Sequence, residues 1–300
     1  MKYLPLSLIM IALFTIAGCS RKSGNETLKV MTLNIRYDNP GDSLNGWSNR
    51  EEQICSFIKE EKPAIIGMQE VLWHQYELLD SVLTAYASEG IGREDGVHAG
   101  EMNPVFYRKD RFELARKITF WLSETPEIAG SKSWGSSLPR IVTWVELVEK
   151  ESHRHIFIFN THFAHDSDTA RIMSSKLLLK EIEKAASESP FIVTGDFNME
   201  RTSKGYEVLT GPDESVPLIK DSYVITQKKP GGPAYTFNGF FEKQGSQRID
   251  FIFVKNGMKV LSHNTFVRKK DGVFISDHWP VEAVISLSTK DLIFQEKNNQ

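Results

Sequence analysis

Cysteine is scarce in this 300-residue sequence, which contains only Cys19 and Cys55. Neither belongs to a CxxC pattern, and HExxH is also absent, so zinc sites built from those patterns are excluded. Two cysteines allow at most one disulfide, and none within the molecule if Cys19 carries a lipid. Cys55 is therefore expected to be a small residue of the hydrophobic core.

The sequence also lacks an excess of positive charge. Its 36 lysines and arginines are outnumbered by 39 aspartates and glutamates, which gives a formal net charge of −3. The chain as a whole does not attract polyanions, so a nucleic-acid partner is not favoured unless a local basic patch exists. The hydrophobic and charged fractions, 40% and 25%, are those of an ordinary soluble globular protein.

The N-terminal apolar run, from Leu4 to Ile16, is shorter than the roughly 20 residues that cross a bilayer. Because it follows the basic Lys2, it indicates a secretory signal peptide over residues 1–18. The small residues before Cys19 resemble the lipobox of bacterial lipoproteins. We therefore expect lipidation of Cys19 and a tether over residues 19–27, which would attach the protein to a membrane of the bacterial cell envelope. A plain signal peptide and a retained anchor are the alternatives.

Residues 28–300 are expected to form one domain, because no repeat or low-complexity linker divides them. Strand patterns and helix patterns alternate at both ends of the domain and flank a β-rich middle. Ser48 with Glu51 predicts a capping box that starts the first helix, and periodicity predicts a later helix over Asp168–Ala186. This order favours an α/β (α+β) fold, a four-layer sandwich of two packed, mostly antiparallel sheets flanked by helices.

Several predicted strands end in polar residues where the apolar pattern should continue. Each one alone has a structural explanation, such as a turn, a helix cap or a hydrogen-bonded core histidine. Together they form a set of hard oxygen ligands and histidines, which suits Mg²⁺ or Mn²⁺ and a phosphate group. The residues are Asn34, Glu70, His162, Asp196, Asn198, Asp250, Asp277 and His278.

The motifs "LNIR", "MQEV", "NTHF", "GDFN", "RIDFIFV" and "SDHWPV" occur in this order between Leu28 and about Leu287. In this order they resemble the motif series of the endonuclease/exonuclease/phosphatase superfamily, which includes deoxyribonuclease I. The resemblance implies a phosphoesterase that depends on Mg²⁺ or Mn²⁺ and hydrolyses a phosphodiester, or a phosphomonoester, by in-line attack of water.

The resemblance also implies a metal-binding side of the site. Glu70 matches the metal-binding glutamate, Asn34 the asparagine beside the metal, and Asp277 an aspartate near it. Arg36 stands close by and is expected either to contact the substrate phosphate or to form a surface salt bridge.

A catalytic side follows from the same motifs. Asp196 corresponds to the aspartate that orients or deprotonates the attacking water, and Asn198 to the asparagine that binds phosphate. His278 and His162 correspond to two histidines at the scissile phosphate. Asp250 corresponds to the aspartate that orients His278, and such a partner fixes the tautomer and favours the protonated form.

Four further residues are candidates for substrate contacts. Glu101 is expected to pair with His162, the alternative being a loop carboxylate exposed to water. Trp121, Trp134 and Arg140 lie in a segment that is expected to wall the pocket, the alternative being two core tryptophans and an ion-paired arginine.

The substrate stays open between a phosphorylated glycan or small organic phosphate, nucleic acid, and a lipid headgroup. The acidic chain favours the first of these. A protein of another class, a non-catalytic envelope lipoprotein that binds a phosphorylated ligand or a partner protein, is the alternative. The protein is expected to be a monomer.

Overall fold

The computed structural model describes residues 27–187, 189–211, 219–241, 247–255 and 257–287. The expected signal peptide, Cys19 and the tether up to residue 26 lie outside the described residues. Within the described ranges, no helix is both long enough and apolar enough to cross a membrane.

Two six-stranded sheets form the centre of the molecule, and in each sheet four of the five strand pairings are antiparallel. The strands of the first sheet, in spatial order, are β11 (Val260–Thr265), β14 (Val281–Ser286), β1 (Thr27–Asn34), β2 (Ile65–Gln69), β4 (Val105–Arg108) and β3 (Tyr86–Glu89). The strands of the second are β5 (Phe112–Trp121), β6 (Ile141–Glu149), β7 (His155–His162), β8 (Phe191–Asp196), β10 (Asp250–Lys255) and β9 (Ile219–Asp221).

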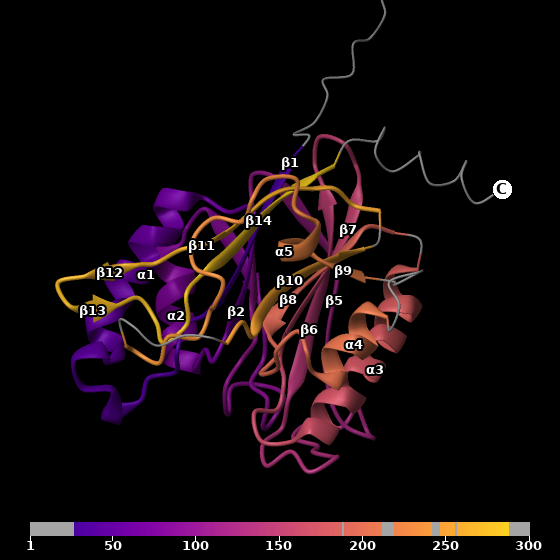
Figure 1. The fold of residues 1–300 in the computed structure, drawn as a ribbon, viewed down its shortest axis with the longest axis horizontal. Coiled ribbons are helices and arrows are strands. Elements are labelled where there is room, and N and C mark those ends of the chain that lie inside the picture. Colours follow the sequence, from indigo (N-terminus) through magenta and orange to yellow (C-terminus); the bar gives the residue numbers. More distant parts are fainter. Residues whose placement is uncertain (1–26, 188, 212–218, 242–246, 256, 288–300) are drawn as a thin grey trace, which may run out of the picture.

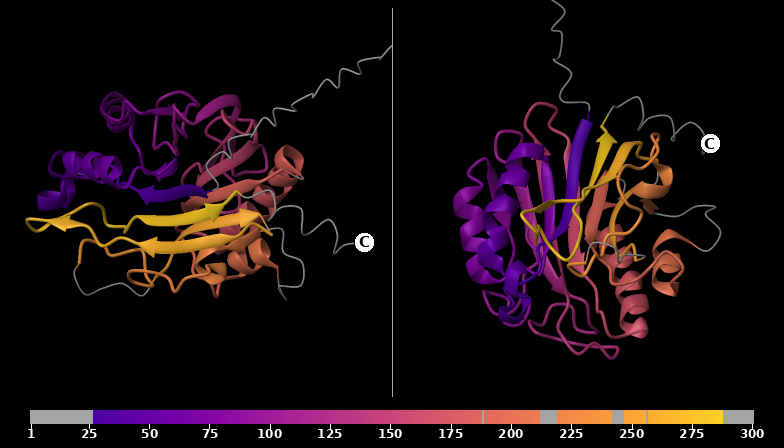
Figure 2. Two further views of the ribbon diagram at one scale, coloured as in Figure 1. Left: turned by 90° about the horizontal axis from the view of Figure 1, so that it is seen from above. Right: turned by 60° about the vertical axis from the view of Figure 1, so that its left-hand side comes forward.

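Helices cover the outer face of each sheet (Figures 1 and 2). The first sheet is covered by α1 (Trp47–Glu61) and α2 (Trp73–Val82), and the second by α3 (Asp168–Ala186) and α4 (Lys204–Thr210). The remaining elements are short: a 3-10 helix (Pro40–Asn45), α5 (Ser222–Ile225) and the hairpin of β12 (Lys269–Lys270) and β13 (Val273–Phe274). The expected four-layer sandwich is therefore confirmed.

Three hydrophobic clusters hold these layers together. The first lies between the two sheets and includes Val30 and Ile158. The second joins α1 and α2 to the first sheet and contains the buried Cys55, as expected. The third joins α3 to the second sheet through Leu178 and Ile182. Because the side chains of a strand alternate between its two faces, each sheet can contribute to two clusters at once.

One local expectation is wrong, although the helix itself exists. The first helix begins at Trp47 after Gly46, and no side chain caps it, so Ser48 lies inside the first turn. Trp47 is buried and belongs to the second cluster. Its packing fixes the start of the helix earlier than the capping pattern indicates. The bounds expected for α3 agree with the structure.

Candidate active site

A cleft of about 500 Å³ opens at the edge of the two sheets where β1, β2, β7 and β8 end. Most of its lining is polar or charged. The lining residues are Arg36, Tyr37, Glu70, Glu101, Leu138, Arg140, His162, His165, Asp196, Asn198, Phe237, Gln247, Ile249, Asp277 and His278.

Side chains of the two sheets meet at the floor of this cleft. β1 ends at Asn34, whose partner in the parallel strand β2 is Gln69, so Glu70 follows directly beside it. The Nδ2 atom of Asn34 donates to Glu70 Oε1 and to Asp196 Oδ2, each at 3.0 Å. Asn34 therefore links a carboxylate of the first sheet to one of the second.

The pairing of strands in the second sheet aligns three further groups. Asp196 ends β8 and lies opposite His162 of the parallel β7 and Asp250 of the antiparallel β10. The distance from His162 Nε2 to Asp196 Oδ2 is 3.5 Å. The backbone N–H of Asn198 donates to Asp196 Oδ1 at 2.9 Å, and its Nδ2 donates to the carbonyl oxygen of Phe163 at 3.0 Å.

His278 reaches the cleft from the loop between β13 and β14. Its Nδ1 atom lies 2.8 Å from Asp250 Oδ2, and its Nε2 atom lies 3.7 Å from Asp196 Oδ2. The Ser276 hydroxyl donates to the carbonyl oxygen of Asn34 at 2.6 Å. This loop is thus tied both to β1 and to β10.

Three residues just beyond strand ends have a left-handed backbone. They are Arg36 (φ 58°), Glu70 (φ 61°) and Asn198 (φ 49°). Such conformations are uncommon for residues other than glycine, and active sites are one of the places where they gather. Here they turn the chain at once after β1, β2 and β8, so that all three residues line the cleft.

Burial changes the protonation of the acidic groups. It raises the pKa of Asp196 to about 7, and the nearby Asp250 carboxylate adds to the shift. Burial also raises the pKa of Asp277 to about 6. For His278 burial opposes the charge, but the carboxylates of Asp250 and Asp196 raise its pKa well above the ordinary value. His278 is therefore a cation, and Asp196 exchanges a proton near neutral pH.

Positive charge gathers on the His162 side. Glu101 Oε2 lies 3.7 Å from His162 Nδ1 but accepts a closer hydrogen bond, 2.7 Å, from Arg93 Nη1. Arg140 is 5% exposed and contacts His165 Nδ1 at 3.0 Å, and its Nε and Nη1 have no hydrogen-bond partner in the described part of the chain. Burial and the charges of Arg140 and Arg93 lower the pKa of His162 well below its ordinary value.

Arg36 forms an ion pair and also lines the cleft. Its guanidinium forms two hydrogen bonds with Asp42, at 2.9 and 3.0 Å. It also lines the cleft, where Nε lies 3.7 Å from Asp277 Oδ2 and Nη1 lies 4.0 Å from Glu70 Oε2. The ion pair with Asp42 therefore holds a positive charge beside the acidic groups.

Trp121 and Trp134 do not line the cleft, contrary to the expectation that they wall it. Trp121 is buried, and its Nε1 donates to the carbonyl oxygen of Arg93 at 2.6 Å, so its ring packs beneath the loop that carries Glu101. Trp134 has φ 59°, and its carbonyl oxygen accepts from the Ser167 hydroxyl that caps α3. Of these three candidates only Arg140 faces the cleft.

Sequence reasoning missed three residues that belong to this region. His165 lies three residues after His162, and this short spacing was a usable signal. Arg93 pairs with Glu101 from a loop position that no pattern distinguishes. Arg50 is fully buried and donates to the carbonyl oxygens of Ile35, Arg36 and Ile275, which joins the chain segments behind the cleft.

The groups at the cleft floor fit a divalent cation. Ligand atoms of Glu70, His162 and Asp196 all lie within 4.8 Å of one another. Asp196, Asp250 and His278 form a second group of this size, but the cationic His278 is bonded to Asp250 and offers no lone pair to a metal. The raised pKa values of Asp196 and Asp277 reflect crowded, buried carboxylates, whose negative charge a cation would offset. Oxygen donors are those that Mg²⁺ and Mn²⁺ prefer.

Comparison with known proteins adds four findings. The model of the Endonuclease/Exonuclease/phosphatase family matches residues 31–278. The solved structure of an endonuclease/exonuclease/phosphatase from Bacteroides vulgatus is 39% identical, with a TM-score of 0.83 over 88% of this chain and 100% of that one. A mannosyl-6-phosphatase from Bacteroides thetaiotaomicron is 31% identical, with a TM-score of 0.79 over 87% and 100% of the two chains. An uncharacterized protein of Acanthamoeba polyphaga mimivirus is 31% identical over 186 residues, 57% of this chain and 67% of that protein.

Proposed function

Because the chain belongs to the endonuclease/exonuclease/phosphatase family, we propose that it hydrolyses a phosphate ester of a carbohydrate with the help of Mg²⁺ or Mn²⁺. One observation carries the proposal. Carboxylates of both sheets and two histidines surround Asp196 in one cleft, which a buried arginine also lines.

The metal would be held by oxygen atoms of Glu70 and Asp277, with Asn34 beside it. Asn34 already holds the Glu70 carboxylate in place through a 3.0 Å hydrogen bond. When bound, a divalent cation supplies positive charge to phosphate oxygens. Arg36, fixed by Asp42, adds a further positive charge at the same edge of the cleft.

Asp196 is the group proposed to take the proton of the attacking water. Burial raises its pKa above the ordinary value, and a carboxylate with a raised pKa is a stronger base. His278 is proposed to donate from Nε2 to a phosphate oxygen, since its Nδ1 is bonded to Asp250. Neutral His162 and the two nitrogen atoms of Arg140 that have no partner, Nε and Nη1, are proposed to bind further phosphate oxygens. Phosphoryl transfer asks little of a protein beyond this positioning and charge compensation.

The cleft favours a small phosphorylated substrate over nucleic acid. Among the residues that the structure describes, its lining includes two arginines and four carboxylates but no lysine, whereas a protein that grips nucleic acid neutralises many phosphates with lysine and arginine. The similarity to a mannosyl-6-phosphatase supports a sugar phosphate, and a phosphomonoester in particular.

A comparison of substrates tests this proposal. Mannose 6-phosphate, p-nitrophenyl phosphate, bis(p-nitrophenyl) phosphate, DNA and sphingomyelin are each incubated with the protein in Mg²⁺, Mn²⁺ or EDTA. We expect metal-dependent release of phosphate from the two monoesters and a loss of kcat of about 10²- to 10⁴-fold in Asp196→Ala. Faster hydrolysis of the diester, DNA or sphingomyelin would contradict the substrate assignment. Binding of mannose 6-phosphate without turnover at any metal concentration would instead support the non-catalytic alternative.

The proposal also includes attachment to the bacterial cell envelope through a lipid on Cys19. β1 starts at Thr27 and ends at Asn34 in the site, so the chain enters the sheet at the end opposite the cleft. This placement favours a substrate that is not part of the anchoring membrane. Cys19→Ser is expected to move the protein from the membrane fraction to the soluble fraction, and an unchanged distribution would refute the anchor.

A further inference from the structure

We propose that Arg248, through a buried ion pair with Asp221, is a positioning residue that holds Asp250 and thereby orients His278. Arg248 lies two residues before Asp250 and does not line the cleft. Its effect on catalysis rests on the proposed function, but its effect on the geometry of His278 does not.

The ion pair has the geometry of a fixed bidentate contact. Arg248 Nη2 lies 2.6 Å from Asp221 Oδ2, and Nη1 lies 3.2 Å from Oδ1. The side chains of Asp221 and Arg248 are 1% and 11% exposed, so water does little to loosen the pair. A planar guanidinium matches a carboxylate in this way, and a lysine ammonium does not.

Two aromatic rings hold the guanidinium in addition. Its central carbon lies 4.5 Å from the ring centre of Tyr223 and 4.4 Å from that of Phe251. Phe251 directly follows Asp250 in β10. The guanidinium of Arg248 is therefore held by the ion pair and by two aromatic rings. A side chain held in this way restricts the backbone that carries it.

The segment anchored by Arg248 leads into the catalytic pair. The Thr236 hydroxyl accepts from the backbone N–H groups of Ile249 and Asp250, both at 3.1 Å. These bonds fix the position of the backbone at Ile249 and Asp250. The ion pair of Arg248 fixes how this backbone is turned about its own axis. The carboxylate of Asp250 then meets His278 Nδ1 at 2.8 Å. A small rotation at Arg248 would lengthen this bond and turn the imidazole away from the phosphate position.

Asp221 also connects the segment of Arg248 to helix α4. Its Oδ2 accepts from the Tyr206 hydroxyl at 2.9 Å, and its Oδ1 accepts from the Tyr223 backbone at 2.9 Å. Tyr206 belongs to α4, which follows the Asp196–Asn198 segment in the chain. One buried carboxylate thus joins α4, through Tyr206, to the segment before Asp250, through Arg248.

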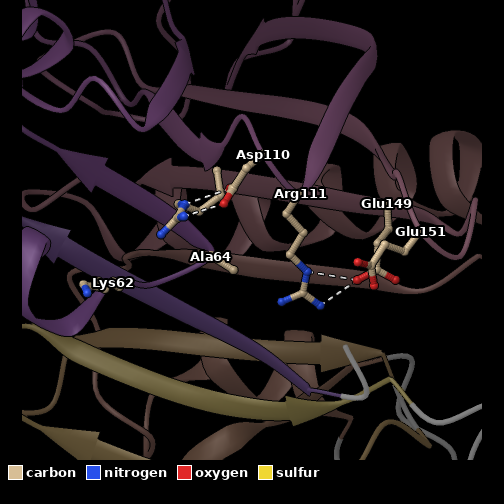
Figure 3. Close-up of a pocket in the computed structure, with 7 residues that line it drawn as sticks. Lys62, Ala64, Asp110, Arg111, Glu149 and Glu151 are labelled. Carbon is tan, nitrogen blue, oxygen red and sulfur yellow. Dashed lines mark hydrogen bonds and ion pairs between the residues drawn. The ribbon is translucent and has the colours of Figure 1, made fainter. Parts of the chain in front are cut away.

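The chain contains a matched control at the opposite end of the sheets. Arg111 forms hydrogen bonds of 2.9 and 2.6 Å with Glu149 in a pocket beside Ala64, where β2 begins (Figure 3). The side chains of Arg111 and Glu149 are 15% and 3% exposed, and the guanidinium carbon lies 5.2 Å from the ring centre of Phe112. Arg111→Lys therefore removes a similar buried pair far from the cleft.

The experiment compares Arg248→Lys with Arg111→Lys in the full chain. Proton NMR follows the hydrogen-bonded Nδ1 proton of His278, which is assigned by its absence in His278→Gln, and the kinetics of mannose 6-phosphate hydrolysis are measured in parallel. We expect Arg248→Lys to shift or broaden the Nδ1 signal and to lower kcat by about 10- to 100-fold at an unchanged KM, as losses of supporting contacts do. Arg111→Lys should leave the Nδ1 signal unchanged and kcat within twofold of the wild type.

Arg248→Lys with an unchanged Nδ1 signal and kcat would overturn the proposal, as would an equal loss in Arg111→Lys. If Arg248→Lys does not fold, Tyr223→Leu, which removes one of the two rings, is measured by the same criteria. If the wild type hydrolyses none of the esters, the proposed function fails, and the Nδ1 signal still decides the role of Arg248.

Discussion

Binding of Mg²⁺ is expected to release protons, in an amount that depends on pH. Burial raises the pKa of Asp196 to about 7 and that of Asp277 to about 6. Asp277 is a proposed ligand of the cation, and a carboxylate oxygen of Asp196 lies within 4.8 Å of a carboxylate oxygen of the other proposed ligand, Glu70. The charge of a bound cation favours the ionised form of both Asp277 and Asp196, so protons on these groups are released when the metal binds. Both pKa values are raised, so protons are held at low pH and lost as pH rises through 6 and 7.

The two pKa values set the size of the effect. At pH 7, Asp196 is half protonated and Asp277 about a tenth protonated, so about 0.6 protons leave per metal bound. The release rises to about 1.4 protons at pH 6 and falls to about 0.1 at pH 8. The apparent affinity for Mg²⁺ should accordingly increase about tenfold between pH 6 and pH 7.

Isothermal titration calorimetry in buffers of different ionisation enthalpy measures this release directly. Asp196→Asn removes one of the two titrating groups and should reduce the release at pH 7 to about 0.1 protons. A wild-type release near zero at pH 6, or the same release in Asp196→Asn at pH 7, would refute the reasoning. The absence of Mg²⁺ binding would refute the metal site itself.

Three further changes have defined outcomes. Asp250→Asn removes the charge that keeps His278 protonated, so kcat should fall about 10²- to 10³-fold and its alkaline limit should move to lower pH in a kcat–pH profile. Burial raises the pKa of Glu282 from 4.5 to about 7. The free energy of unfolding therefore falls by up to about 3 kcal/mol as the pH rises between these two values. Urea unfolding should show Glu282→Gln to be more stable than the wild type only at higher pH. Gly67→Ala places a methyl group 2.1 Å from Thr194 Oγ1 and should lower the free energy of urea unfolding by about 1–3 kcal/mol.

Each of these predictions has a contrary result. A kcat of Asp250→Asn within twofold of the wild type would remove the role given to that carboxylate. Glu282→Gln would contradict the linkage if its stability followed the pH dependence of the wild type. An unchanged urea midpoint in Gly67→Ala would contradict the third prediction, because it would mean that the two sheets make room for the methyl group without losing stability.

Local pattern was sufficient to predict most of the strands and the polar residues at several of their ends. In β1, the apolar Met31 and Leu33 alternate with polar residues, and the strand ends in Asn34. This period of two places Asn34 at the rim of a sheet. Glu70 and Asp196 could be predicted in the same way. Such positions follow from strand periodicity, and the strand register then brings them together.

Side-chain directions in loops could not be predicted, because contacts between distant segments decide them. The sequence around Trp121 is compatible both with a ring in the core and with a ring that faces the cleft. Arg140 lines the cleft because its Nη2 contacts His165, 25 residues later. Arg248 meets Asp221 across 27 residues, and nothing in the sequence between them marks the pair.

The site exists only when the two sheets pack in one relative position, because Asn34 and Glu70 come from one and Asp196 from the other. A polar layer between the sheets fixes that position. Asn160 of β7 accepts from Gln69 of β2 at 2.6 Å and donates to the carbonyl oxygen of Met68 at 2.7 Å. These partners are buried and leave no alternative for a shifted packing, since each unpaired group would be strongly unfavourable. The same contacts that hold the sandwich together therefore also align the carboxylates of the cleft, and a change at Asn160 is expected to reduce both the free energy of unfolding and kcat.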